Sequence, residues 1–179
     1  NYRKMTRELQ LELLRTRALS RQPWHGPPHG KDEGLYSYLI SATCWEHQPI
    51  IGNSPTRMSA FEKQLITTCK ETSTVFAWAI LPNHYHILVQ TEKLTALIAA
   101  LGQLHGKTSF EWNGEDDSRG RRAWHRCVDR RIRSAAHFWS TVNYIHHNPV
   151  KHGYIEKWMD WPYSSAHDFL ESVSREKAI

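Results

Sequence analysis

Two apolar runs joined by Pro82-Asn83 form the most strand-like stretch of the sequence. Residues 75–81 read Val-Phe-Ala-Trp-Ala-Ile-Leu, and residues 84–90 read His-Tyr-His-Ile-Leu-Val-Gln. β-branched and aromatic residues on both sides of a turn signal predict a hairpin or a bulged connection. Residues 35–45 are rich in Tyr, Leu, Ile and Thr and predict another strand, and residues 124–132 predict a further one.

Three segments show the helical spacing of apolar residues: residues 59–71, 94–110 and 134–147. The third helix is expected to end at the Asn148-Pro149 step, because the residue before a proline avoids helical backbone angles. One narrow arc of this helix predicts the face that packs on the core, and it consists of Ala135, Phe138, Trp139, Val142 and Ile145.

The chain divides into an extension, a main domain and a short tail. Residues 1–19 have an amphipathic helical pattern and residues 22–34 are rich in proline and glycine, so residues 1–34 predict a helical extension with a linker. Residues 35–171 form the main domain and residues 172–179 the tail. Strands interleaved with helices, one of them in a hairpin, predict an α+β sandwich of the ferredoxin or RRM-like kind, with helices packed on a central antiparallel sheet.

The composition excludes several classes of protein. Hydrophobic residues make up 40% of the 179 residues and charged residues 23%, which is typical of a folded globular chain. A net charge of +5 favours a polyanionic partner only weakly. The sequence contains no run of 18 apolar residues, so we expect no membrane span. Its three cysteines lie far apart, which fits a reducing cytoplasm and predicts neither a CxxC zinc site nor a disulfide framework.

His84 and His86 are the first candidates for chemistry. Residues i and i+2 of a strand point to the same face of the sheet. Two imidazoles placed in this way can hold one divalent cation. The alternative is that both are ordinary half-buried or exposed histidines.

Tyr144 is the second candidate. On an ideal helix it lies roughly 150° from the middle of the core arc, and Asn148 follows four residues later on the same side. The phenol is a candidate nucleophile, and the carboxamide points away from the core face on the same side. The alternative is that both side chains simply face solvent.

A basic segment, residues 119–133, is the third feature. It can contact phosphates, and Trp124 and His125 can stack on bases, although a solvated charged face is an equal alternative. The candidate DNA-binding residues are Arg119, Arg121, Arg122, Trp124, Arg126, Arg131, Arg133 and Lys151. The preceding Glu115, Asp116 and Asp117 are more typical of a soluble turn than of a metal site. Trp158 and Trp161 are candidates for stacking on bases. The alternative for Trp161, together with Pro162, is that it pins the C-terminal segment to the sheet.

Four motifs in order resemble one family. Residues 81–89, Leu-Pro-Asn-His-Tyr-His-Ile-Leu-Val, resemble the HUH motif (His, bulky residue, His) of single-tyrosine transposases. Residues 143–153 resemble their nucleophile helix, and residues 160–165 together with Ile132-Arg133 are similar to the REP-associated tyrosine transposases. The resemblance covers about residues 35–171. Just before Ile-Arg, that group is expected to have acidic residues, or an aromatic residue with a histidine. This sequence has Asp-Arg-Arg there, at residues 129–131, and so departs from the group.

The resemblance implies a metal-dependent enzyme that cleaves single-stranded DNA near palindromic hairpins and can rejoin the strands. Tyr144 would be the nucleophile and would form a 5′-phosphotyrosine intermediate. His84, His86 and Asn148 would hold Mg²⁺ or Mn²⁺, with His147 as the rival third ligand.

Two other functions stay open at this point. One is a domesticated protein that binds DNA or RNA hairpins without cleavage, and the other is a metal-dependent phosphodiesterase that does not use Tyr144. In each case we expect a bacterial protein of the cytoplasm, associated with the nucleoid, that does not bind membranes and is a monomer or a homodimer.

Overall fold

A computed structural model describes residues 34–176 of the chain, with side chains to residue 171. The extension predicted for residues 1–34 lies, apart from Gly34, outside the described residues, as do residues 177–179. Within the described part, no helix combines the length and the apolar character that crossing a membrane requires.

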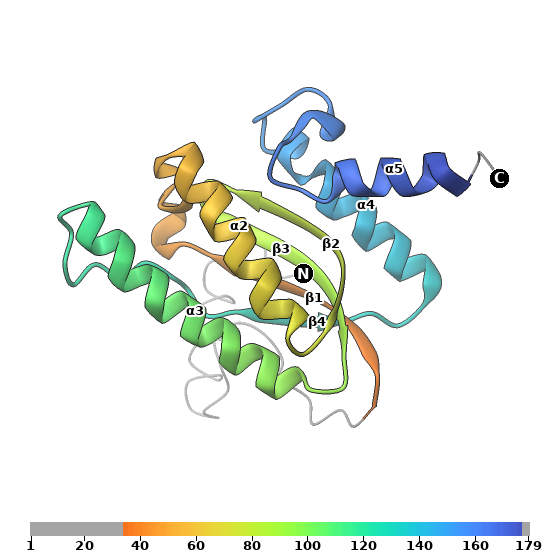
Figure 1. The fold of residues 1–179 in the computed structure, drawn as a ribbon, viewed down its shortest axis with the longest axis horizontal. Helices are drawn as coiled ribbons and strands as arrows, with labels where there is room; N and C mark the ends of the chain where they lie inside the picture. Colours follow the sequence, from red (N-terminus) through yellow and green to blue (C-terminus); the bar gives the residue numbers. More distant parts are fainter. Residues whose placement is uncertain (1–33, 177–179) are drawn as a thin grey trace, which may run out of the picture. The chain divides into compact units, whose positions relative to one another are not determined.

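Four antiparallel strands form one sheet in the order β2-β3-β1-β4 (Figure 1). The strands are β1 (Tyr36–Thr43), β2 (Thr74–Leu81), β3 (His84–Thr91) and β4 (Val128–Arg131). The predicted hairpin is present, with Pro82 and Asn83 between β2 and β3. The predicted α+β fold, with a central antiparallel sheet that carries His84 and His86, is therefore confirmed.

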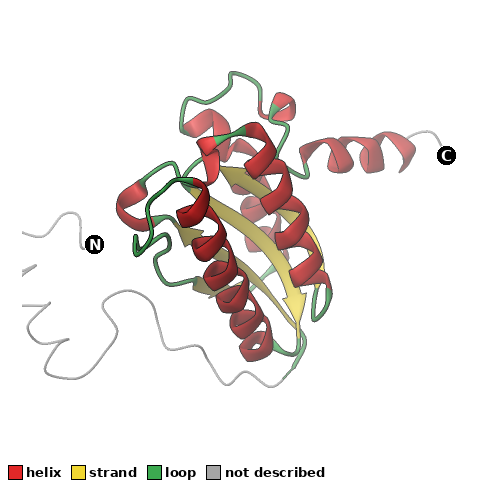
Figure 2. Ribbon diagram, turned by 60° about the vertical axis from the view of Figure 1, so that its left-hand side comes forward, coloured by secondary structure: helices red, strands yellow, loops and turns green. Residues whose placement is uncertain are grey.

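The helices cover both faces of this sheet (Figures 1 and 2). Helices α2 (Pro55–Lys70) and α3 (Leu94–Glu115) pack on one face, where Tyr85 and Ile87 join the larger core. Helix α4 (Ala135–Lys151) packs on the other face, where Leu88 joins a smaller cluster with Val142. Because side chains alternate along β3, His84 and His86 lie on the α4 face.

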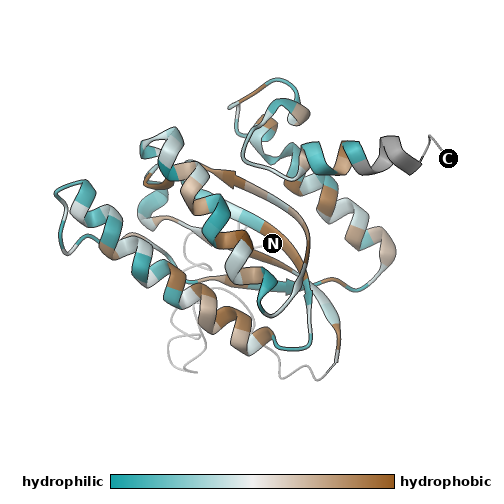
Figure 3. Ribbon diagram, viewed as in Figure 1, coloured by the Kyte–Doolittle hydropathy of each residue, from teal (hydrophilic) through white to brown (hydrophobic). Residues whose placement is uncertain are grey.

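Helices α2 and α3 are both longer than their apolar patterns predicted. Ser54 is the N-cap of α2 and accepts a hydrogen bond from the Arg57 backbone N–H at 3.1 Å, so the helix begins at Pro55 rather than at residue 59. The second half of α3 is mostly hydrophilic (Figure 3). Buried Thr108 and Trp112 nevertheless carry its packed face past residue 110 to Glu115.

Helix α4 differs from its prediction in two respects. It continues through Pro149 to Lys151, because burial of Asn148 and Pro149 outweighs the backbone bias of the residue before proline. Its core face is also narrower than predicted. Val142 and Ile145 are buried, but Ala135 is exposed and Trp139 is 55% exposed.

The C-terminal segment is fastened to strand β2. The Trp161 indole N–H donates to the Ile80 carbonyl at 2.9 Å, and Ser164 forms an isolated bridge with Ala79. Trp161 is therefore buried and anchors the C-terminal segment to the sheet, which is one of the two roles predicted for it. Helix α5 (Ala166–Glu176) follows and runs past residue 171, where the sequence placed the end of the domain. Three short 3-10 turns, Trp45–His47, Ile51–Asn53 and Trp158–Asp160, complete the described elements.

Candidate functional site

The two histidines of β3 form the floor of the candidate site. Their ring centroids lie 5.0 Å apart, and each residue is only 8% exposed. The spacing of two along the strand therefore places both imidazoles together, as the sequence predicted.

Helix α4 places Tyr144 and Asn148 over these histidines. The Tyr144 hydroxyl lies 3.3 Å from His86 Nε2, and Asn148 Oδ1 lies 3.0 Å from His84 Nε2. Tyr144 is 39% exposed, whereas Asn148 is fully buried, so the solvent-facing alternative does not describe Asn148. One helical turn thus supplies a phenol and an amide to the two imidazoles.

Hydrogen bonds behind the imidazoles fix their orientation. Asn83 Nδ2 donates to the His47 carbonyl at 3.1 Å, which leaves Asn83 Oδ1 to face His84 Nδ1 at 2.7 Å. An amide oxygen only accepts, so His84 carries its proton on Nδ1 and its Nε2 lone pair faces α4. Ser41 Oγ lies 2.6 Å from His86 Nδ1 and orients that ring in the same way.

Burial keeps both imidazoles neutral at pH 7. It lowers the pKa of His84, and it lowers the pKa of His86 to about 3, with smaller contributions from His84, His152 and Lys151. A neutral His84 directs a lone pair at the carbonyl oxygen of Asn148, and Asn148 Nδ2 is buried without a hydrogen-bond partner. Two facing lone pairs repel, and a cation between them would remove the repulsion.

The donor set therefore fits a divalent cation. Two imidazole nitrogens and an amide oxygen suit Mn²⁺ well and are acceptable for Mg²⁺. Among the described residues no three His, Cys, Asp or Glu side chains are grouped for metal binding, and the third donor of this set is the amide of Asn148.

His147, predicted as the rival third ligand, does not lie with His84, His86 and Asn148. It is exposed, its Nδ1 lies 3.0 Å from the Asn143 carbonyl, and its ring lies beside Trp158. The position four residues after Tyr144, not three, faces the histidines.

Sequence reasoning gave no role to three residues near this site: His152, Asn83 and Ser41. His152 lies with its ring centroid 5.0 Å from that of His84, and it could have been found because it is four residues after Asn148. Asn83 and Ser41 orient the imidazoles. Lys151, predicted as a DNA contact, places its ammonium group 5.3 Å from the centre of the Tyr144 ring.

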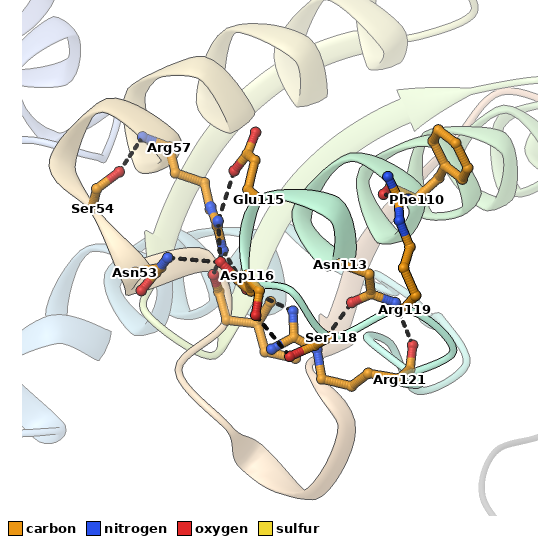
Figure 4. A network of polar contacts seen from close by, with 11 residues as sticks. Asn53, Ser54, Arg57, Phe110, Asn113, Glu115, Asp116, Ser118, Arg119 and Arg121 are labelled. Carbon is orange, nitrogen blue, oxygen red and sulfur yellow. Dashed lines mark hydrogen bonds and ion pairs between the residues drawn. The ribbon is translucent and has the colours of Figure 1, made fainter.

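Several residues of the basic segment have structural partners. Arg121 pairs with Asp116 at 2.6 Å, and Arg119 donates to the Phe110 carbonyl at 2.7 Å (Figure 4). Asp116 also accepts from Arg57, which lowers the pKa of the Asp116 carboxyl to about 2. This acidic turn therefore holds α2 and α3 together.

The other members of the segment differ in exposure. Arg122 lies over the Trp45 ring and Arg131 over the Tyr36 ring, at 3.8 and 3.4 Å, while Arg126 and Arg133 are exposed. Trp124 is 7% exposed and stacks on His105 with 4.2 Å between the ring centroids. Trp124 is a core residue, so its ring faces the protein interior rather than a nucleic-acid base.

Comparisons with known proteins agree with the motifs. No protein-family model matches the sequence. A putative REP-associated tyrosine transposase of Haemophilus influenzae is 33% identical over 101 residues, which cover 51% of this chain and 57% of the relative. The REP-associated tyrosine transposase of Escherichia coli is 29% identical over 91 residues, which cover 51% of this chain and 53% of the relative. Over about half of its length the chain is similar to REP-associated tyrosine transposases.

A solved structure of a REP-associated tyrosine transposase bound to a REP hairpin has the same fold. Its TM-score is 0.63 with 18% sequence identity, and the match covers 80% of this chain and 84% of the other. The chain spans about half the length of the curated relatives that it matches.

Proposed function

We propose that this chain is a metal-dependent endonuclease and transposase that cleaves single-stranded DNA near palindromic hairpins and rejoins the strands. The observation that carries this proposal is the placement of Tyr144 and Asn148, one turn apart on α4, against the neutral pair His84 and His86. The names of the relatives support the class of enzyme, and the solved structure of a relative with a REP hairpin supports the partner.

The reaction follows from the chemistry of Tyr144. The phenol releases its proton to solvent as its oxygen attacks the scissile phosphorus. The bond to the 3′ oxygen breaks, and that oxygen takes up a proton from solvent and leaves as a 3′-hydroxyl. The product is a 5′-phosphotyrosine ester, and attack by a 3′-hydroxyl reverses the step and joins strands. Because the ester preserves the phosphodiester bond energy, rejoining needs no nucleotide triphosphate.

A phenol has a pKa of about 10 in water and is a weak nucleophile at pH 7 without help. The hydroxyl lies 3.3 Å from His86 Nε2, the nitrogen that would ligate the cation, so a bound cation would take the place of this hydrogen bond with the hydroxyl close beside it. The ammonium group of Lys151 adds a positive charge where a DNA phosphate would approach Tyr144. His84, His86 and Asn148 would hold Mg²⁺ or Mn²⁺, which would polarise the phosphate and favour in-line attack.

A covalent-adduct assay tests the proposal. Labelled single-stranded hairpins from the palindromes that flank the gene are incubated with protein and Mn²⁺ or Mg²⁺, and the products are separated on denaturing gels. We expect a protein–DNA band that needs metal and disappears in both Tyr144→Phe and His84→Ala. Tyr154→Phe, a change at another exposed tyrosine, is the matched control and should keep the band.

Two outcomes separate the other functions. Cleavage that persists in Tyr144→Phe but not in His84→Ala would identify a phosphodiesterase that does not use the tyrosine. Tight hairpin binding in a gel shift, with no adduct or cleavage in either metal, would identify a hairpin-binding protein.

A further inference from the structure

A pocket of about 380 Å³ opens beside Tyr144, toward the N-terminal end of α4. Its roof is one face of that helix, because His137, Ser140 and Tyr144 are spaced at i, i+3 and i+7. Its floor is the sheet, where β1 and β4 contribute Leu39 and Arg130, which are partners in the strand register. The pocket therefore continues the line of side chains that begins at Asn148 and passes through Tyr144.

The lining combines one cation with polar and apolar surface. Arg130 contributes its guanidinium, for which the described residues provide no hydrogen-bond or ion-pair partner. The Ser140 and Thr141 hydroxyls both donate to the His137 carbonyl, so their oxygens can still accept hydrogen bonds. Leu39 and Val128 supply the apolar part. A ligand that fits this lining has a flat, partly apolar body with hydrogen-bond donors, and it carries an anionic group.

The size and position of the pocket narrow the choice of ligand. A volume of 380 Å³ is at the small end of the range for ligand pockets, which run from about 300 to 1,000 Å³. A pocket of this volume suits one unpaired nucleotide and is too small for a base pair. Tyr144 lines the pocket, so a nucleotide there would be next to the phosphate that this hydroxyl attacks.

We propose that this pocket binds one of the two unpaired nucleotides that flank the scissile phosphate, with Arg130 on its phosphate and the α4 hydroxyls on its base. This inference rests on the proposed function and adds to it a determinant of the cleavage position. Arg130 lies on the α4 face of the sheet, whereas Arg131 lies over the Tyr36 ring on the opposite face. Adjacent arginines of β4 therefore have different roles.

Two variants test the pocket, each with a matched control. Ser140→Leu fills the space under α4, and Asn143→Leu makes a similar change at an exposed position of the same helix outside the pocket. Arg130→Gln removes the charge from the pocket, and Arg131→Gln removes the neighbouring charge from the opposite face. None of these four changes alters Tyr144 or the side chains proposed to hold the metal.

The experiment measures adduct formation with hairpin oligonucleotides in which each nucleotide near the cleavage site is made abasic in turn. We expect the wild type to lose roughly tenfold in rate at one flanking position, the effect of one lost base contact. In Ser140→Leu the intact substrate should already react about tenfold more slowly, and the abasic change should add no further loss. Asn143→Leu should behave as the wild type. Equal rates for intact and abasic substrates in the wild type would overturn the proposal.

If no oligonucleotide gives an adduct, that result counts against the proposed function. A second measurement then tests nucleotide binding in the pocket by itself. Each of the four deoxynucleoside monophosphates is titrated into labelled protein and followed by NMR. The pocket predicts shifts at Ser140, Thr141 and Arg130 for at least one nucleotide, and their loss in Ser140→Leu. Absence of these shifts for all four nucleotides would overturn the inference.

Discussion

At the scale of single residues, Asn83 determines which nitrogen of His84 faces α4. Its amide is held by the His47 carbonyl, so its oxygen accepts the His84 Nδ1 proton. Second-layer hydrogen bonds of this kind fix the tautomer of a metal-binding histidine and set its ring orientation. The turn that joins β2 to β3 therefore sets the orientation of a candidate site residue on the strand that follows it.

Replacing Asn83 tests this role. In Asn83→Ala the Nδ1 proton of His84 loses its acceptor, and we expect roughly a 10- to 100-fold loss in Mn²⁺ affinity or in adduct formation. Asn83→Asp is the matched control, because it keeps an acceptor oxygen and should retain most of the affinity. The concentration of Mn²⁺ that gives half-maximal adduct formation is the measurement. Equal values for Asn83→Ala and the wild type would show that the turn does not orient His84.

Local periodicity predicted the residues that face one another across the site, but not the residues that support them. A period of two placed His84 with His86, and a period of 3.6 placed Asn148 with Tyr144. Ser41 reaches His86 only because β1 pairs with β3 in a register that the whole sheet determines. Trp124 was predicted as a base contact because its sequence neighbours are arginines, whereas its burial depends on α3, which is remote in sequence.

At the scale of elements, α4 tolerates a proline only because of where it lies. Pro149 removes one hydrogen bond in the last turn, and the helix ends two residues later. The end is closed by the His152 N–H on the Asn148 carbonyl and by the Tyr154 N–H on the Pro149 carbonyl. The sequence predicted the helix correctly but placed its end too early. The burial of the last turn depends on tertiary packing, which the spacing of apolar residues along the helix does not reveal.

Proline in the middle of α4 should be costly. Thr141 is buried halfway along the helix, so Thr141→Pro would remove an interior backbone hydrogen bond and clash with the preceding turn. We expect a loss of about 3 kcal/mol or more in the free energy of unfolding, together with loss of the adduct. Thr141→Ser keeps the hydroxyl that donates to the His137 carbonyl and serves as the control. Urea unfolding measures the difference, and an unchanged stability in Thr141→Pro would contradict the helix.

At the scale of the whole molecule, the described part of the fold buries several histidines in the neutral state. Burial lowers the pKa of His105 to about 4 and that of His146 to about 4, from an ordinary value of 6.5. His84 and His86 shift in the same direction. Between pH 6.5 and pH 4 the unfolded chain therefore binds more protons than the folded chain, and acid destabilises the fold.

A second loss of stability follows at lower pH. The hydrogen bonds from Arg57 are the largest cause of the lowered pKa of Asp116, about 2 against an ordinary 3.8. The stabilisation that this carboxylate provides is complete above pH 3.8 and is lost as the pH falls toward 2. The fold should thus lose stability in two successive windows, the histidines first and the acidic turn afterwards.

Urea unfolding at a series of pH values separates these windows. His105→Gln removes one titrating group and should reduce the slope of stability against pH between 6.5 and 4 by roughly 1.4 kcal/mol per pH unit. His167→Gln, the same change at an exposed position, is the matched control. Asp116→Asn should flatten the curve only below pH 4, and Asp117→Asn, the same change in the same turn, is the matched control. If Asp116→Asn changed the slope between pH 6.5 and pH 4, the two windows would not be independent, and α2 and α3 would be coupled to the buried histidines.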